Sequence, residues 1–565
     1  MLTDERTAYI THDHGKKWKK AVDDEVVRIY PHQYDNNRVY FLTAGKKFYY
    51  STDRGRRDSI RSHEAPVMPN KERLSIMQFH PKEESWIIWM GGKHCDKAGD
   101  KDCHTVAYVS QKNGEDESWE PLVPYVKKCA FVWREAGRSV KEEQIFCEQH
   151  TNEEMGAPLE LISSEDWFKK KDVKFKSVVE FATMSEFIVV ATKADDGTLH
   201  LDASLDANTF AEAKFPPKFF DVHQTAYTVL DSSTHAVFLH VTVNPTRDQE
   251  YGSIIKSNSN GTSYVMSLAA VNRNMEGYVD FEKMQGLEGV AVANVIVNVD
   301  EVNKGSKKKK QSRITHNDGA DWEPLQAPEK DSEGKAYECD VSDKYKCGLH
   351  IHGYTERADP REMYSSPTAV GMMLAVGNVG SELSTFGEAN TFMTTDAGIT
   401  WTEIKKGTYA WEFGDQGSVI VIVRRGEDTD HVYYSLDNGS KWNLYQFSDH
   451  KIRVEAITTV PSDTSLNFLL WGKDSKELVA VNLDFSGLPE FSKKCELNEN
   501  NPTSGDYDLW IPQHPLQKEE PQCLFGHVAQ YHRKKRDAKC KNGQRIDQMH
   551  DIARNCSCTR RDFEW

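Results

Sequence analysis

The hydrophobic positions of this chain fall into short runs rich in β-branched residues. Clear examples are residues 186–192, 235–243, 289–299 and 418–423. Residues of this type favour strands, and each run is shorter than the ~18 to 20 residues that a membrane span requires. Helical periodicity is scarce, and residues 545–553 are its clearest instance. The pattern predicts an all-β fold with a helical segment near the C-terminal end.

Polar turns of one form separate these runs. The form is Ser or Thr, any residue, Asp or a small polar residue, any residue, Gly, two further residues and an aromatic residue, and we call it the aspartate box. Four clear copies are residues 11–18, 315–322, 394–401 and 435–442, and five weaker copies are residues 51–58, 110–119, 163–168, 204–210 and 257–264. Each copy is expected to be a hairpin turn.

The residue types of the box explain why it should form a turn. A carboxylate such as Asp13 can accept hydrogen bonds from N–H groups of its own turn. Gly15, two residues later, permits the positive φ that such a turn needs. Trp18 can then fold back over the hairpin and bury its ring. Because this turn satisfies its own polar groups, we interpret the box carboxylates as structural and not catalytic.

The spacing of the boxes predicts the architecture. Gly15 and Gly55 lie 40 residues apart, and Gly398 and Gly439 lie 41 apart. Such intervals suit four-stranded propeller blades, whose repeats run about 40 to 50 residues. The longer step before Gly398 contains residues 339–347, which we interpret as a loop inserted in one blade. The sequence therefore predicts a β-propeller.

The net charge excludes one class of partner. A formal charge of −16 argues against a nucleic-acid surface, because phosphate binding relies on clustered cations. Two basic runs remain, residues 307–310 (KKKK) and 533–536 (RKKR). The first is expected to be a solvated loop between strands. The second resembles a secretory processing site, and we favour a solvated surface for it.

The cysteines indicate an oxidising compartment, although the chain opens without a visible secretory leader. Three close pairs are Cys95 with Cys103, Cys129 with Cys147, and Cys339 with Cys347, and the tail carries Cys495, Cys523, Cys540, Cys556 and Cys558. His94 and His104 flank the first pair, so a zinc site is an alternative there, but a disulfide is preferred. His350 and His352 alternate on one strand face and are interpreted as structural.

Three sequons fit a secreted chain. Asn260, Asn438 and Asn555 each stand in an Asn-X-Ser/Thr triplet and are candidate glycosylation sites. For Asn260 and Asn438 a second interpretation is open, because Asn-Gly is itself a favoured hairpin turn.

Several segments together resemble the sortilin family, and within it the fungal vacuolar sorting receptors. They are the boxes, LHIHGYTERADPREMYSSPTAVGMMLAVGNVG (residues 349–380), WEFGDQGSVIVIV (411–423), FLLWG (468–472) and the cysteine tail. The resemblance covers essentially the whole chain. It implies a ten-bladed β-propeller over residues 1–490, with an incomplete first blade, followed by a truncated ten-cysteine module over residues 491–565. It also implies that Cys495 pairs with Cys540 and Cys523 with Cys556, which leaves Cys558 without a partner.

The resemblance also implies a function. Such receptors bind soluble vacuolar hydrolases, for example carboxypeptidase Y, in the trans-Golgi network, deliver them to the late endosome or prevacuolar compartment, and recycle. Their full-length form is a type I membrane protein whose cytoplasmic tail, absent from this sequence, is expected to bind retromer. Neither catalysis, a cofactor nor a metal is expected. Release of cargo could follow the charging of some of the 21 histidines as the lumen acidifies.

The ligand-binding residues are the least direct inference. Sortilin-like relatives capture a peptide carboxylate with a basic residue, but the matching stretch here (ADDGTLH, residues 194–200) carries Asp195 and Asp196 instead. These acids would suit a basic motif in the cargo, and a solvated acidic loop is the alternative. Tyr227 matches a ligand-contacting tyrosine of the family.

A glycoside hydrolase is the second function class to consider. Sialidase-like enzymes also use aspartate-box propellers and need two carboxylates at the scissile bond. With 87 acidic residues, the sequence leaves such a pair possible, and a panel of fluorogenic glycosides would distinguish an enzyme from a receptor.

Overall fold

The structure is a computed structural model. It describes residues 1–56, 59–70, 75–95, 101–133, 140–184, 186–195, 198–216, 227–231, 235–357, 364–460, 463–475, 477–498, 500–501, 504–512, 523–543 and 550–557. Within these residues the chain is almost entirely strands and turns, and its α-helix, α1 (Val299–Val302), is a single short turn. The predicted all-β class is confirmed.

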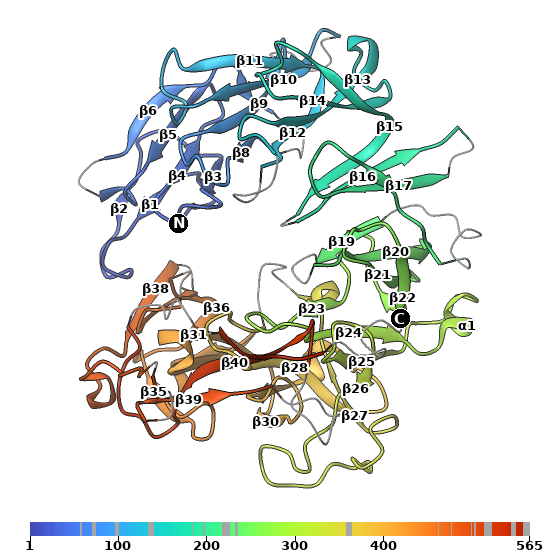
Figure 1. The fold of residues 1–565 in the computed structure, drawn as a ribbon. Coiled ribbons are helices and arrows are strands. Elements are labelled where there is room, and N and C mark those ends of the chain that lie inside the picture. Colours follow the sequence, from blue (N-terminus) through green and yellow to red (C-terminus); the bar gives the residue numbers. More distant parts are fainter. Residues whose placement is uncertain are drawn as a thin grey trace.

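The first three sheets lie in the N-terminal quarter of the chain (Figure 1). The first contains β1 (Tyr9–Ile10) and β2 (Lys19–Lys20). The second contains β3 (Arg28–Pro31), β4 (Val39–Leu42), β5 (Lys47–Ser51) and β6 (Arg61–Glu64). The third contains β7 (Met68–Pro69), β8 (Met77–Phe79), β9 (Ile87–Lys93), β10 (His104–Ser110) and β11 (Trp119–Pro124).

Two long sheets follow. One runs from β12 (Val126–Phe131) through β13 (Ile145–His150), β14 (Leu159–Ser164), β15 (Asp172–Thr183), β16 (Ile188–Lys193) and β17 (Leu199–Ser204) to β18 (Ala211–Glu212). The other contains β19 (Tyr227–Asp231), β20 (Phe238–Asn244), β21 (Tyr251–Ser257), β22 (Tyr264–Asn272), β23 (Phe281–Lys283), β24 (Ala291–Ile296), β25 (Lys310–Thr315) and β26 (Glu323–Pro324). Each long sheet contains two box turns, so the number of sheets does not give the number of blades. Ten blades remain a prediction.

Three four-stranded sheets complete the propeller. The first contains β27 (Gly348–Ile351), β28 (Met373–Gly380), β29 (Asn390–Thr394) and β30 (Thr402–Lys405). The second contains β31 (Tyr409–Gly414), β32 (Val419–Arg424), β34 (His431–Ser435) and β35 (Asn443–Gln446). The third contains β33 (Asp428–Thr429), β36 (Ile452–Thr458), β37 (Asn467–Asp474) and β38 (Glu477–Asp484).

The four hydrophobic runs that predicted strands are strands. They correspond to β16, β20, β24 and β32, and residues 289–299 also reach the start of α1. The interiors of these strands are buried on both faces, as all five residues from Val419 to Val423 illustrate. Burial on both faces favours apolar side chains at most positions, which explains why the runs do not alternate strictly with polar residues.

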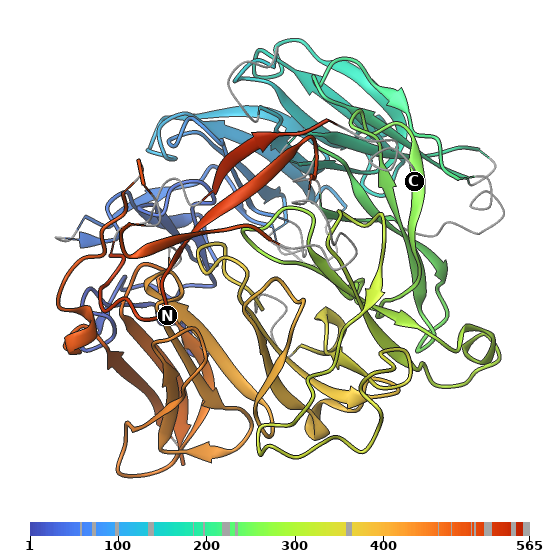
Figure 2. The ribbon, with the colours of Figure 1, turned by 60° about the horizontal axis from the view of Figure 1, so that its bottom comes forward.

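The sheets form a closed ring. Figure 2 shows the chain passing once around it, from the blue N-terminal sheets through green and yellow to the orange sheets. The last sheet meets the first box turn, where the ring centroids of Trp18 and Trp471 lie 5.3 Å apart. The side-chain amide of Asn482 donates to the carbonyl oxygen of His14 at 2.8 Å. Residues more than 450 positions apart therefore close the propeller.

A separate three-stranded sheet contains β39 (Tyr507–Trp510), β40 (His527–Lys534) and β41 (His550–Asn555). We call residues 491–557 the C-terminal module, and it lies across one side of the ring (Figure 2). The prediction of a helix over residues 545–553 is wrong for residues 550–553, the part of this range that the structure describes, because they belong to β41. That strand pairs with β40, for example Ile552 with Ala529. The boundary at residue 490 remains a prediction.

Five disulfides join ten cysteines in the expected pairs. They are Cys95–Cys103, Cys129–Cys147, Cys339–Cys347, Cys495–Cys540 and Cys523–Cys556. The first three close short loops within the propeller, and the last two link distant parts of the module. Cys558 lies outside the described residues.

Candidate ligand-binding site

The box turns are satisfied by their own atoms. In the first box the backbone N–H of Lys17 donates to the Asp13 carboxylate at 2.8 Å, and that of Gly15 donates to the Thr11 hydroxyl at 2.8 Å. Gly15 has a φ of +87°, and the indole N–H of Trp18 donates to its carbonyl oxygen at 3.0 Å. The hydrogen bond from Lys17 holds the pKa of Asp13 below its usual value. The predicted turn chemistry is confirmed.

Five of the other boxes repeat this geometry between neighbouring strands. The same hydroxyl-to-glycine bond occurs at Ser51 and Gly55, Ser110 and Gly114, Thr315 and Gly319, Thr394 and Gly398, and Ser435 and Gly439. In the box at residues 163–168 the hydroxyl belongs to Ser164, so that box begins one residue later than expected. Because the carboxylates accept bonds from their own turns, they are poorly placed to serve a ligand.

The three ligand-binding candidates are only partly within the described residues. Asp195 is exposed in the turn between β16 and β17, while Asp196 lies outside the described residues. The backbone of Tyr227 begins β19, an edge strand of its sheet, and pairs with Val241. The side chain of Tyr227 is likewise outside the description. Their role therefore stays a prediction.

Two lysines that the sequence did not single out lie on β12, an edge strand of its sheet. Lys127 donates to the carbonyl oxygen of Val179 at 3.0 Å, and Lys128 donates to that of Phe181 at 2.7 Å. Lys127 also lies 3.4 Å from the carboxylate of Glu148, whose side chain is fully buried. Burial raises the pKa of Glu148. The lysines thus tie β12 to β15 while keeping partial exposure.

The histidines of the LHIHG segment are structural, as expected. His350 accepts the backbone N–H of Ser312 at 3.1 Å through Nδ1, and its Nε2 lies 3.0 Å from the carbonyl oxygen of Gly380. His352 is buried and contacts the Glu356 carboxylate through Nδ1. Burial lowers the pKa of both histidines to about 4. Burial therefore favours the neutral form of each ring, and the two rings contact separate partners.

The solvated-loop prediction for residues 307–310 is wrong for two of the four lysines. The Nζ of Lys308 donates to the carbonyl oxygens of Glu250 and Arg273 at 2.8 and 2.9 Å. Lys310 pairs with Glu356, and both lysine side chains are about 15% exposed or less. Because side chains alternate along an extended segment, residues 308 and 310 point inward together.

The basic run at residues 533–536 is also not simply a solvated surface. Arg533 and Lys534 end β40, the central strand of the module, and pair with Asp508 and Tyr507 of β39. Lys534 lies 3.3 Å from the Ser418 hydroxyl of the propeller. Since strand pairing and docking hold this segment, a processing protease would not find it as a free extended chain.

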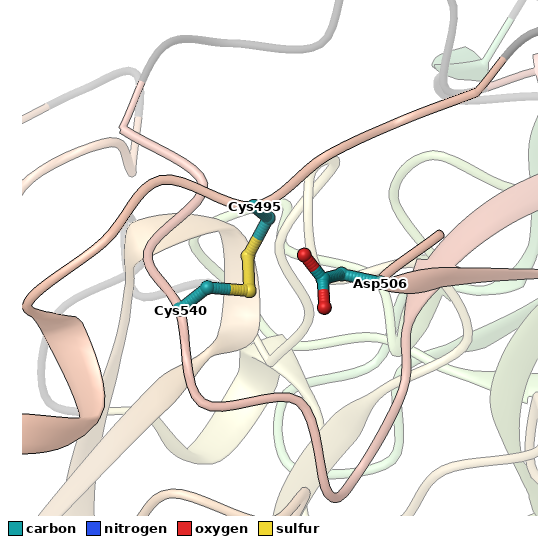
Figure 3. A group of neighbouring side chains, drawn as sticks. All are labelled: Cys495, Asp506 and Cys540. Atoms are coloured by element: carbon teal, nitrogen blue, oxygen red, sulfur yellow. A yellow bond between two sulfur atoms is a disulfide. The ribbon is translucent and has the colours of Figure 1, made fainter. Parts of the chain in front are cut away.

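Cys495, Asp506 and Cys540 lie together in the module (Figure 3). The two sulfur atoms are bonded to each other at 2.04 Å, so neither is a thiolate that could bind a metal. The Asp506 carboxylate accepts the backbone N–H of Glu496 at 2.9 Å. The zinc alternative at residues 94–104 fails for the same reason, because Cys95 and Cys103 form a disulfide.

The candidate glycosylation sites differ in their surroundings. Asn260 and Asn555 are exposed, the first in a box turn and the second at the end of β41. Asn438 is half-buried and lines a small cavity that Arg533 and Asn542 of the module also line. The module therefore crowds one of the three sequons.

Comparison with known proteins agrees with this architecture. A family model described as "Sortilin, neurotensin receptor 3" matches residues 6–457, and its C-terminal counterpart matches residues 459–565. The chain belongs to the sortilin/Vps10 family. This sortilin/Vps10 chain is 88% identical over 564 residues to "Vacuolar protein sorting/targeting protein 10" of Pyrenophora tritici-repentis, and 50% identical over 575 residues to the protein of that name from Coccidioides posadasii.

The matched relatives are much longer than this chain. All of this sortilin/Vps10 chain is matched, but it spans about 38% of the length of either relative. Those relatives are named for protein sorting and not for an enzymatic reaction. Among solved structures, the β-propeller domain of the trilobed protease from Pyrococcus furiosus is 8% identical with a TM-score of 0.28, covering 67% of this chain and 98% of that one. No helix among the described residues is long and apolar enough to cross a membrane.

Proposed function

We propose that this chain is the lumenal cargo-binding part of a sorting receptor. Its cargo would be soluble vacuolar hydrolase precursors of the carboxypeptidase Y type. The receptor would collect them in the trans-Golgi network, release them in the late endosome or prevacuolar compartment, and recycle through retromer. It would have no catalytic role of its own. Family membership over the whole chain is the observation that carries this proposal, and the five disulfides suit a lumenal site.

The ring offers a physical route to cargo binding. Edge strands such as β12 and β19 begin their sheets, and an extended peptide can add to an exposed strand edge and place side chains in pockets. Lys127 and Lys128 are partly exposed beside Glu180, whose side chain is 67% exposed. The backbone of Tyr227 runs along β19, and the exposed Asp195 follows β16. We propose Asp195, Asp196 and Tyr227 as cargo contacts.

A direct binding measurement tests the function. The chain, secreted with its disulfides intact, should bind an immobilised vacuolar hydrolase precursor and not the mature hydrolase. Replacing both acids, Asp195→Asn with Asp196→Asn, should weaken binding by about 1 kcal/mol, or roughly fivefold in Kd. The matched control is Glu153→Gln with Glu154→Gln, two adjacent exposed acids, which should bind normally.

The opposite results are equally informative. If the double Asn variant binds as the unchanged chain does, the two acids are not contacts, although the receptor function stands. If no precursor binds at all, and the chain instead cleaves a fluorogenic glycoside, the receptor proposal fails in favour of an enzyme.

A further inference from the structure

Strand β15 has a free edge over half of its length. Residues 178–183 pair with β16, whereas residues 172–178 pair with β14. No other strand in the described part of the chain pairs with residues 172–177, so their outward side is an open edge. Val173 is 41% exposed, and Lys176 and Ser177 are also exposed. The unpaired N–H and C=O groups of such an edge can bond to a further strand.

Lysines are concentrated along this edge. Residues 169–177 contain five lysines and one aspartate, in a chain whose formal charge is −16. The aspartate, Asp172, lies 2.8 Å from the ammonium group of Lys174. Lys171 donates to the side-chain amide oxygen of Gln149 at 3.0 Å. The edge therefore keeps a surplus of positive charge.

Three of the five lysines have no partner among the described residues. The side chains of Lys169, Lys170 and Lys176 are exposed, and none of them forms a hydrogen bond or an ion pair within that part of the chain. Their ammonium groups therefore face solvent beside an unpaired strand.

The carboxylates around this edge are engaged in other contacts. Asp166 accepts the backbone N–H of Lys170 at 2.9 Å in its own box turn. Glu165 lies 2.6 Å from the ammonium group of Lys141. Glu160, on β14, is half-buried. None of the three forms an ion pair with a free lysine of the edge, so the positive charge of these lysines remains available to a partner.

The lysines determine which kind of strand this edge accepts. Charged side chains on edge strands, lysines above all, oppose unwanted strand pairing. A second copy of this chain, paired edge to edge, would place lysine against lysine, and like charges directly opposite each other are destabilising. An extended acidic segment would place carboxylates there instead, which favours pairing.

We propose that the outer edge of β15 binds an extended acidic segment of a partner protein. The segment adds as a strand beside residues 172–177 and sets its carboxylates against Lys169, Lys170 and Lys176. Its main-chain hydrogen bonds supply affinity, and the lysines select acidic sequences. The site is separate from the cargo contact proposed at Asp195, which lies in the turn between β16 and β17 and would take a basic motif.

Peptide binding to the disulfide-intact chain tests the proposal. The probe is a fluorescent peptide of alternating Glu and Val, measured by anisotropy at neutral pH and low salt. Replacing the three free lysines together, as Lys169→Gln, Lys170→Gln and Lys176→Gln, should weaken binding about tenfold. The matched control carries the same loss of charge at three exposed lysines of other segments and should bind like the unchanged chain. Its substitutions are Lys17→Gln, Lys304→Gln and Lys307→Gln.

Two further measurements distinguish strand addition from attraction between charges. A peptide of the same sequence, N-methylated at alternate residues, keeps its carboxylates but loses main-chain donors, and it should bind about tenfold more weakly. Amide hydrogen exchange of residues 172–177 should slow when the unmodified peptide binds, because its strand covers their open side.

Three outcomes would overturn the proposal. Equal binding of the N-methylated peptide would mean that charge alone attracts it. Equal weakening in the control variant would mean that any exposed lysine serves. A sulfated polysaccharide that displaces the peptide and leaves the exchange of residues 172–177 unchanged would assign the lysines to a polyanion. Should the triple lysine variant fail to fold, hydrogen exchange in the unchanged chain decides the matter.

Discussion

Asp415 and Asn542 bond to each other twice across the seam between the propeller and the C-terminal module. The backbone N–H of Asn542 donates to the Asp415 carboxylate at 2.9 Å, and the Asn542 amide donates to the Asp415 carbonyl oxygen at 2.6 Å. Both residues are buried, and burial raises the pKa of Asp415 against the effect of the hydrogen bonds from Gly543 and Asn542. This relationship makes Asp415 the main polar anchor of the module.

Removing that anchor should release the module while the ring stays folded. Asp415→Ala leaves two buried N–H groups without acceptors, at a cost of about 2 to 4 kcal/mol. We expect faster proteolysis within the module and little change in the propeller, measured by timed digestion with mass spectrometry. Asp508→Ala, at an exposed carboxylate of the same module, is the control and should digest like the unchanged chain. Equal digestion of both variants would show that docking does not depend on Asp415.

The contact between Trp18 and Trp471 should control closure of the ring. Trp18→Ala removes a half-buried ring whose centroid lies 5.3 Å from that of Trp471. We expect the free energy of unfolding to fall by about 1 to 2 kcal/mol, which is less than the loss on removing a fully buried aromatic side chain. Amide hydrogen exchange should become faster in β37 and β38. Trp322→Ala, in a box turn away from the closure, should leave β37 and β38 protected. Unchanged exchange in Trp18→Ala would contradict this role.

The buried histidines predict that acid destabilises the fold. Burial lowers the pKa of His240 and His350 to about 4, whereas an unfolded histidine titrates near ~6.5. The unfolded chain therefore binds protons first, and stability that is present above pH ~6.5 is lost as the pH falls toward 4. At pH ~5 each of these histidines should lower the free energy of unfolding by about 2 kcal/mol.

Denaturant unfolding at pH 7 and pH 5 measures this effect. Between pH 7 and pH 5, the free energy of unfolding of His350→Gln should fall by about 2 kcal/mol less than that of the unchanged chain. His12→Gln, at an exposed position, should follow the unchanged chain. If His350→Gln and the unchanged chain lose the same stability, His350 is not held neutral by the fold.

Glycan occupancy should follow exposure. We expect Asn260 and Asn555 to carry glycans and Asn438 to carry little or none, because the module covers its surroundings. Glycopeptide mass spectrometry of the secreted chain measures occupancy at each site. The Asp415→Ala variant, with its module loosened, should gain occupancy at Asn438. Full glycan occupancy of Asn438 in the unchanged chain would contradict the docking of the module beside Asn438.

Local features of this protein could be predicted from its sequence. A box turn such as residues 11–18 is built from bonds between residues at most four apart, as the contacts of Thr11 and Asp13 show. The disulfide Cys95–Cys103 likewise spans eight residues. When interacting residues lie only a few positions apart, their spacing in the sequence is constant and can be recognised without the structure.

Only the tertiary structure decided three features of this protein. They are the burial of Lys308 and Lys310, the strand at residues 550–555, and the cavity beside Arg533. Their partners come from remote parts of the chain: Glu250 lies 58 residues from Lys308, and Asn542 lies 127 from Asp415. A charged side chain looks the same in a sequence whether water or a distant carboxylate surrounds it. The sequence alone determined the repeating hairpins and the family, while closure of the ring and docking of the module determined which charges are buried and which remain exposed.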